Sequence, residues 1–331
     1  MTEQRLAVKN RVGKYKSFFS NVGSFLDKPG FRTLLPLTGL IVMIVIFAHL
    51  TDMRIIQTRS INLILSQVYV LMIACTGVFM VMTIGGLDFS QGSILGVSSI
   101  VISYLSFYSI PLAIVAGIAT GAFIGAFNGL FHVVFTIPSF IVTICSMFLF
   151  RGICAYLTTD APVAAVTGIT AYHSTWINIS LTLSVLLISF LIYQFTRLGI
   201  TLKAIGAGET AARFSGIRTK KTKFLVFMAA GAITGFAAFL NVAKVGSITA
   251  TSGSQLEAQI LIALVLGGMP IMGGAKVRFS NIIVGALMFA ILHNGLVMVG
   301  LDSAQQQLIK GIVFVLVVAL TIDRRQLLVI K

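Results

Sequence analysis

The sequence predicts an all-α polytopic membrane protein with about ten transmembrane helices. Of its 331 residues, 57% are hydrophobic and only 10% are charged, whereas soluble domains carry about 25% charged residues. Apolar runs of about 20 residues, the length that crosses a bilayer as a helix, recur along nearly the whole chain. These runs leave no room for a soluble domain of any size.

The predicted spans are separated by short polar breaks. We place them at residues 34–50, 61–84, 91–108, 110–134, 139–158, 178–196, 222–243, 255–268, 280–300 and 305–322. Together they form one transmembrane domain over 34–323, between an N-terminal tail of residues 1–33 and a C-terminal tail of residues 324–331.

Basic residues gather on one predicted side of the membrane. Seven precede the first span and seven more lie within 197–223. Cytoplasmic loops carry such an excess, so both termini and the polar segment 203–217 are predicted to be cytoplasmic. The net charge of +15 is explained by this topology. Because no folded basic domain exists, we expect no nucleic-acid partner.

The fourth predicted span carries glycines at a spacing of four: Gly117, Gly121, Gly125 and Gly129. They share one helix face and predict the close approach of a neighbouring backbone; alternatively, that face borders a transport path. The segment GAFIGAFNG (121–129) is echoed by GALMFAILHNG (285–295), and the two run in opposite predicted directions. This echo indicates an inverted repeat, a common feature of transporter folds.

The segment 203–217, KAIGAGETAARFSGI, is a polar island between apolar spans. Glu209 follows Gly208, where a carboxylate favours a helix N-terminus. Arg213 lies four residues later, the spacing at which two side chains face each other on a helix. Gly216 supplies a helix stop. A helix of one to two turns at the membrane surface indicates a docking element.

Five stretches of the chain match the sequence patterns of one family. GGLDFSQGS (85–93) resembles the signature GGIDLSVGS, and IPSFIVTICSMFLFRGI (137–153) resembles IPPFIVTLGTM…RGI. AIGAGETAARFSGI (204–217) is similar to the coupling segment AIGGNxxAAxxSGI. LGGMPIMGGAKVRFSNIIVGAL (266–287) and NGLVMVGLDSAQQQLIKGIVFVLVVAL (294–320) resemble the remaining family patterns, GGTSLxGGxGxxxGTxxGA and NGLxLxGVxxxxQxxIKGxIIxxAV. The matches occur in order and cover most of the chain, so the chain resembles the permease subunits of ribose-type ABC sugar importers.

The chain also departs from these patterns. Gly208 stands where the family usually has Asn, and Phe89 and Gln91 replace the customary Leu and Val. Residues 275–279 read AKVRF where small residues are usual. These differences argue against transferring a particular sugar from the family.

The resemblance implies a permease in the inner membrane of a bacterium, in contact with membrane lipid, that moves a monosaccharide by alternating access. Two such subunits, identical or paralogous, would form the pathway. Cytoplasmic ATPase subunits would drive it and an extracytoplasmic binding protein would deliver the sugar. The chain has no G-x-x-x-x-G-K-[ST] loop, so ATP and Mg are expected on the partner ATPase, with no cofactor, no metal site and no enzyme activity in this chain. An ion-coupled secondary transporter is the alternative, although the spans are nearly free of the acids that such proteins place at mid-membrane.

The resemblance assigns the polar island as the ATPase-coupling segment. Its candidate residues are Gly206, Gly208, Glu209, Ala211, Ala212, Arg213, Ser215 and Gly216. Ala211, Ala212 and Phe214 would offer a small apolar surface to the ATPase. The GxGxxA spacing also resembles a dinucleotide fingerprint, but no strand precedes it. A plain basic loop is the remaining alternative.

Polar residues in or near the spans are candidates for the translocation path: Asp88, Ser90, Asn128, His293 and Asn294. Asp88 is either a solvated loop acid, a cap for the helix that starts near Ser90, or part of the path. The others either form interhelical hydrogen bonds or contact sugar hydroxyls.

Gln255, Glu257 and Gln259 open the eighth span on the predicted outer side, where they either meet the binding protein or are merely solvated. Arg151, near the outer end of the fifth span, is expected to extend its guanidinium to the interface.

Overall fold

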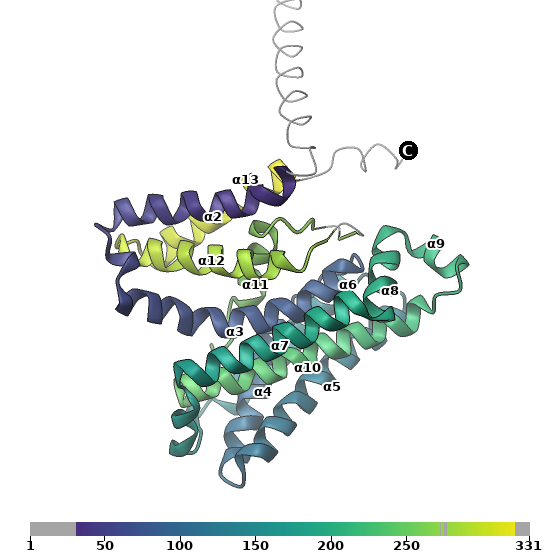
Figure 1. The fold of residues 1–331 in the computed structure, drawn as a ribbon. Coiled ribbons are helices and arrows are strands. Elements are labelled where there is room, and N and C mark those ends of the chain that lie inside the picture. Colours follow the sequence, from purple (N-terminus) through teal and green to yellow (C-terminus); the bar gives the residue numbers. More distant parts are fainter. Residues whose placement is uncertain (1–30, 272, 275–276, 322–331) are drawn as a thin grey trace, which may run out of the picture.

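The computed structural model describes residues 31–271, 273–274 and 277–321, and it is helical almost throughout (Figure 1). The tail residues 1–30 and 324–331, and positions 275 and 276, lie outside the described residues. The helices are α2 (Phe31–Leu50), α3 (Thr58–Thr83), α4 (Gln91–Ser106), α5 (Ile110–Val134), α6 (Ser139–Leu157), α7 (Thr175–Phe195), α8 (Arg197–Ala207), α9 (Glu209–Phe214), α10 (Thr219–Val245), α11 (Leu256–Leu266), α12 (Ser280–Met298) and α13 (Ser303–Thr321). The prediction of a polytopic all-α protein is confirmed.

Each of the ten predicted spans corresponds to one helix among the described residues. Six of these helices, α3, α5, α6, α7, α10 and α12, are long and apolar enough to cross a membrane. Four shorter apolar helices lie in α2, α4, α11 and α13. Helices α4 and α11 are short because each is preceded by an irregular segment inside the bundle. These segments are residues 84–90 and 246–255.

Two ends of the bundle are distinguished by what they carry. The first, here called the α9 end, holds α8 and α9 beyond the last turns of α7 (Figure 1). The second, the hairpin end, holds the two-residue strands β1 (Val163–Ala164) and β2 (Ser247–Ile248), which pair antiparallel. The 3₁₀ helices η1 (Arg54–Ile56) and η2 (Thr167–Tyr172) lie there too. Exposed aromatic side chains at this end, among them Tyr108 and Trp176, are typical of a membrane–water interface.

Helix α3 forms the centre of the bundle. Its most apolar window is 78% buried, against 22% for α7 at the periphery. It packs against α7 and α10 on one side and against α11 and α12 on the other, so that it lies between two groups of helices (Figure 1).

The closest helix pair is α5 with α10. A Cβ added to Gly121 would lie 2.1 Å from the Gly231 carbonyl oxygen, and one added to Gly125 would lie 2.2 Å from the Phe227 carbonyl oxygen. Gly235 in turn lies against the Gly117 backbone. The predicted close approach of a neighbouring backbone is confirmed, and the neighbour is α10.

The two halves of the chain have corresponding parts. In each, a long helix (α3 or α10) is followed by an irregular segment, a short helix (α4 or α11) and a further long helix (α5 or α12). Helix α5 packs on α10, the first helix of the other half, and α12 packs on α3 in the same manner. This exchange is the arrangement expected from an inverted repeat.

Candidate functional site

The first candidate site is the extended segment 84–90, which joins α3 to α4 inside the bundle. The Leu87 amide donates to Ser139 Oγ at 3.0 Å, and the Phe89 amide donates to Thr143 Oγ1 at 3.1 Å. Both partners belong to α6. Irregular backbone at membrane depth is tolerated only where protein groups satisfy it, so the first turns of α6 act as the support for this segment.

Asp88 occupies the centre of the segment and is only 1% exposed. One carboxylate oxygen accepts from the Ser90 amide at 2.9 Å and from Ser90 Oγ at 2.6 Å. The other accepts from Gln91 Nε2 at 2.6 Å. The N-cap residue of α4 is Ser90, and no side chain caps the amides of the first turn. Asp88 therefore orders the N-cap residue and does not itself cap α4, and because it is buried the alternative of a solvated loop acid is wrong. A buried carboxylate needs such donors to offset its desolvation.

The same network reaches two further helices. Asn128 Nδ2 of α5 donates to Ser90 Oγ at 2.8 Å, and Thr234 of α10 donates to the Gln91 side-chain oxygen. The carbonyl oxygen of the Asn128 side chain is buried and has no hydrogen-bond partner among the described residues. Three of the predicted path residues, Asp88, Ser90 and Asn128, are therefore joined in one network that includes an unused acceptor.

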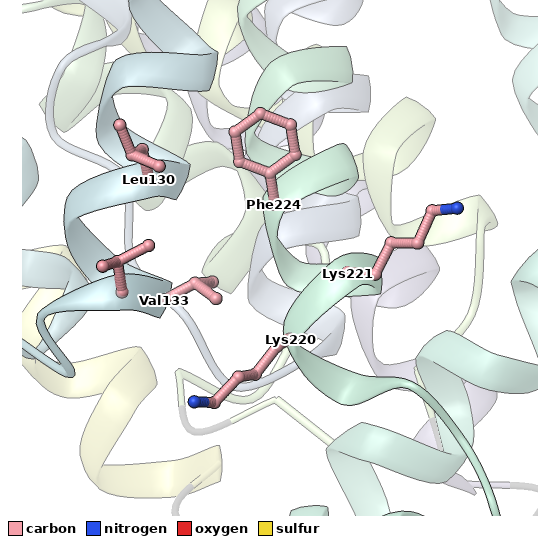
Figure 2. A pocket seen from close by; sticks show the side chains of 6 residues that line it. Leu130, Val133, Lys220, Lys221 and Phe224 are labelled. Atoms are coloured by element: carbon pink, nitrogen blue, oxygen red, sulfur yellow. The ribbon is translucent and has the colours of Figure 1, made fainter.

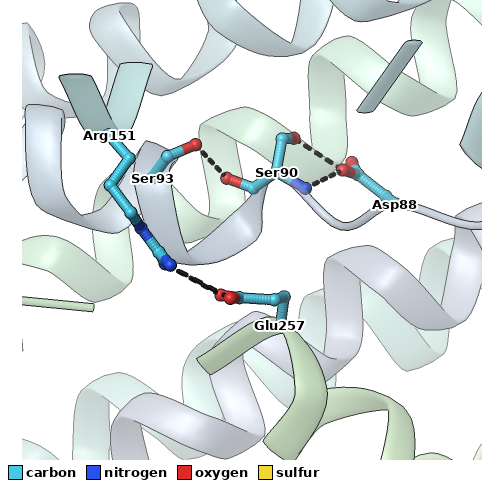
Figure 3. Close-up of polar contacts among 5 residues, drawn as sticks. All are labelled: Asp88, Ser90, Ser93, Arg151 and Glu257. Atoms are coloured by element: carbon cyan, nitrogen blue, oxygen red, sulfur yellow. Dashed lines mark hydrogen bonds and ion pairs between the residues drawn. The ribbon is translucent and has the colours of Figure 1, made fainter. Parts of the chain in front are cut away.

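A second polar group lies where the N-termini of α4 and α11 meet. Arg151 of α6 donates to the Glu257 carboxylate at 3.2 Å (Figure 3). A Cβ added to Gly92 would fall 2.1 Å from Glu257 Oε2 and 2.4 Å from the Gly253 carbonyl oxygen. Only a glycine lets the two short helices come this close, so the ion pair spans a junction between the two halves of the chain.

Two expectations fail at this junction. Glu257 is 8% exposed, so it is not at a surface where a binding protein could meet it. Arg151 does not extend to the interface, because its guanidinium turns inward to Glu257. The sequence reasoning placed the start of α11 at the outer surface, whereas the ten-residue segment that precedes α11 re-enters the bundle. Gln255 remains exposed.

A polar cavity of about 290 Å³ lies beside this junction, among α3, α4, α10, α11 and α12. Its polar lining comes from Ser66, Gln67, Asn241, Lys244, Ser254, Gln259 and His293. Of the predicted residues, Gln259 and His293 reach the cavity. Asn294 lies behind it and donates to Gln67 Oε1 at 3.0 Å. His293 Nδ1 is 2.7 Å from Lys310 Nζ.

Gln67 and Asn241 were missed by the sequence analysis. Both are uncharged amides inside long apolar helices, and the cost of burying such groups is the signal that could have identified them. The pairing of Gln67 with Asn294 joins residues 227 positions apart, which no local pattern reveals.

The predicted coupling segment consists of the end of α8 and the short helix α9. Gly208 separates the two helices with φ 168°, an extended conformation that any residue adopts. A Cβ there would meet only Ala211 Cβ, at 3.9 Å. An Asn, which the resemblance led us to expect at this position, would therefore fit the backbone equally well.

The C-terminus of α9 follows the predicted stop. Gly216 has φ +83° and donates its amide to the Arg213 carbonyl, while the Ile217 amide donates to the Ala212 carbonyl. These two hydrogen bonds form a Schellman motif, in which glycine readily takes the left-handed conformation. Ser215 is the last residue before this turn, and its hydroxyl donates to the Ala211 carbonyl at 3.0 Å.

Glu209 begins α9 as predicted, but its ion-pair partner is Lys223 of α10 at 2.6 Å and not Arg213. Although partial burial acts to raise the pKa of Glu209, the hydrogen bond and the positive charge of Lys223 lower it overall. Ala212 is 4% exposed, so it anchors α9 and does not belong to an exposed apolar surface. Phe214 is 82% exposed and, with Ala211 and Arg213, forms the outward face.

Helix α8 rests directly on the end of α3. A Cβ added to Gly206 would lie 2.0 Å from the Thr83 carbonyl oxygen. Lys203 Nζ of α8 lies 4.6 Å from the centre of the Tyr193 ring. The predicted coupling segment is thus in contact with the residues that immediately precede the extended segment 84–90.

This bundle of apolar helices, interrupted at buried polar segments, defines a polytopic transport protein. A family model described as the permease component of branched-chain amino acid transport systems matches residues 60–318, and the chain belongs to this family. It is 32% identical to the ribose import permease protein RbsC of Escherichia coli K12 over 85% of this chain and 91% of that protein.

Two other relatives agree with this placement. The ribose import permease protein RbsC of Bacillus subtilis is 30% identical, covering 88% of this chain and 92% of that protein. The D-allose transport system permease protein AlsC of Escherichia coli is 26% identical, covering 95% and 96%. No solved structure matches the chain significantly. The resemblance to ribose-type ABC sugar permeases is confirmed, and the chain is a multi-pass permease subunit of the inner membrane.

Proposed function

We propose that this chain forms the membrane path of an ATP-driven importer that carries a monosaccharide related to ribose or allose into the cytoplasm by alternating access. The observation that carries the proposal is the polar cavity at the junction of the two short helices. Its amides, Gln67, Asn241 and Gln259, can each donate and accept hydrogen bonds. That chemistry suits the hydroxyl groups of a neutral sugar.

The junction itself is the proposed closure of the path. Leu256, the first residue of α11, and Gly253, in the segment before it, line the cavity, and Gly253 also lies against Gly92. A sugar in the cavity meets this contact before it can move toward the α9 end. Separation of α4 from α11 would then give it access to the unused Asn128 acceptor. His293 and Asn294 would order the opposite wall.

Helix α9 is the proposed docking element for a cytoplasmic ATPase. Phe214 and Arg213 are exposed on it, and the Glu209–Lys223 pair fixes its orientation on α10. Movement of α9 would pass through α8 to the end of α3 at the contact of Gly206 with Thr83. The extended segment 84–90 begins there, so the contact supports a direct route from ATPase to path.

The opposite end is the proposed site for the extracytoplasmic binding protein. Gln255 is exposed near this side, and α6 and α13 leave apolar faces on which a second permease subunit, identical or paralogous, would pack. Both termini would lie with α9 in the cytoplasm, as the distribution of basic residues predicts.

The test is uptake of labelled ribose and allose into vesicles that contain the full chain with its copurified ATPase and binding protein. We expect uptake to need ATP and to be abolished by vanadate. Uptake that persists with vanadate but is lost with an ionophore would reject the proposal in favour of ion-coupled secondary transport.

A further inference from the structure

A groove separates the last turns of α5 from the first turns of α10 at the α9 end. It encloses about 300 Å³ and is lined by Leu130, Val133, Val134, Lys220, Lys221 and Phe224. In Figure 2, Leu130 and Val133 of α5 face Phe224 of α10 across the groove. It lies outside the polar cavity and shares no residue with it.

The groove exists because two tightly packed helices diverge. A Cβ added to Gly121 or Gly125 would lie 2.1 Å or 2.2 Å from the α10 backbone, and at Gly129 the corresponding distance is 3.1 Å. Beyond Gly129 the facing positions carry side chains instead of glycines. The helices therefore stay apart at this end, and the wedge between them remains open.

The walls of the groove face outward from the bundle. Leu130 is 46% exposed and Val134 is 59% exposed, and the most apolar window of α5 is only 28% buried. In a membrane-spanning helix such a face meets lipid tails. An acyl chain can fill the wedge, because tails are as apolar as the side chains that line it.

Positive charge lies at the mouth of the groove. Figure 2 shows the Lys220 ammonium at the edge of the groove, whereas the Lys221 side chain, although it borders the groove, points away. Lys223 is neutralised by Glu209, but neither Lys220 nor Lys221 forms an ion pair with a described residue. A cation next to an apolar groove matches the two parts of an anionic lipid.

We propose that this groove binds one anionic phospholipid, with an acyl chain between Leu130, Val133 and Phe224 and the headgroup phosphate at Lys220. A free phosphate would leave the apolar walls unfilled, and a zwitterionic lipid would gain less from the lysine. Because α10 continues from α9, the bound headgroup would hold the lysine-rich start of α10 at the membrane surface beside the docking element.

The experiment uses the full chain in vesicles made of an equal mixture of phosphatidylcholine and phosphatidylglycerol, with a trace of phosphatidylglycerol that carries a photoactivatable acyl chain. We expect labelling to map to 130–134 and 220–224 and to be displaced by added phosphatidylglycerol. A lysine in contact with an anionic headgroup contributes about fivefold to binding, and in this groove only Lys220 is placed to make that contact. Lys220→Gln should therefore reduce the labelling of these peptides about fivefold.

Lys221→Gln is the matched control, because it removes the same charge from the adjacent residue and should leave most of the labelling. Val133→Trp fills the groove and should abolish labelling; Leu130→Trp replaces it if Val133→Trp does not fold. Equal loss in Lys220→Gln and Lys221→Gln would overturn the proposal, as would equal labelling by a phosphatidylcholine probe. Crosslinks between two copies of the chain at Val134 would also overturn the proposal, because they would show that a second subunit covers the groove in place of a lipid.

Discussion

Arg151 of α6 and Glu257 of α11 form an ion pair at 3.2 Å across the junction of the two short helices. The two residues come from different halves of the chain, and Gly92 of α4 lies against the same carboxylate. The pair therefore fastens three helices at the place where the proposed path is closed. The Arg151 side chain is 31% exposed and the Glu257 side chain 11% exposed, so the ion pair is largely shielded from solvent.

Removing one partner of this pair should destabilise the protein. We expect Arg151→Met or Glu257→Leu alone to cost about 2 kcal/mol, because each leaves a poorly solvated charge without its partner. The double variant should be more stable than either single variant, since it leaves no unpaired charge. Apparent melting temperatures of the purified chain measure this, and strictly additive losses would show that the pair has no energetic coupling.

The contact between α5 and α10 predicts opposite outcomes for two glycines. Gly121→Ala places a methyl group 2.1 Å from a backbone oxygen and should cost about 1–3 kcal/mol by overpacking. Gly152→Ala meets nothing within 4 Å and should be neutral or stabilising by up to about 1 kcal/mol, because alanine favours helix. Thermal unfolding of the two variants measures these changes in stability. A similar loss of stability in both would contradict close packing as the cause.

Asp88→Asn should disturb the start of α4. The substitution removes one acceptor oxygen and directs amide hydrogens at groups that already donate, at a cost of about 1–3 kcal/mol. Both the melting temperature and sugar uptake should fall. Asp160→Asn, at an exposed position, serves as the control. An Asp88→Asn protein with normal stability and normal uptake would show that neither the start of α4 nor the path needs this carboxylate.

Reversal of charge at α9 should uncouple the ATPase without preventing insertion. Glu209→Lys places a like charge opposite Lys223, so stimulation of the partner's ATP hydrolysis should be lost. The Glu209→Lys/Lys223→Glu double variant restores the opposite charges and should recover this stimulation. Because the pKa of Glu209 is lowered, the pair is complete above the ordinary carboxyl pKa of about 4.3 and weakens only as pH falls below it. ATPase rates between neutral pH and pH about 5 should therefore show no loss from this pair.

The polar cavity makes a prediction about transport and not about stability. Gln259→Leu or Asn241→Leu removes a hydrogen-bonding group from the lining and should reduce sugar uptake about tenfold, the value of one lost hydrogen bond. Gln194→Leu, an exposed amide on α7, is the matched control and should transport normally. Equal uptake by all three variants would place the sugar path elsewhere.

The sequence was sufficient for the spans because apolar length is a local property. The fourth span was predicted at 110–134 and α5 is Ile110–Val134; the sixth was predicted at 178–196 and α7 is Thr175–Phe195. The start of α9 at Glu209 and its end before Gly216 were also predicted, because a charge at the N-terminus and a glycine stop act within one or two turns.

Partners of the charged and polar residues could not be predicted in the same way. Glu209 pairs with Lys223 across a turn, and Arg151 pairs with Glu257 across 106 positions. These contacts depend on how helices pack after they form. The helix α8 was missed as well: with only 11 residues and a mixed composition, it lacks the long apolar run by which the spans were found.

The glycine contact between α5 and α10 also sets an order for biosynthesis. The ribosome delivers α5 more than 80 residues before the first turn of α10, and domains form from the N-terminus as synthesis proceeds. Until α10 enters the bilayer, the glycine face of α5 has no helix to pack against. A nascent chain halted between the two helices would lack its tightest contact and become a substrate for membrane quality-control proteases.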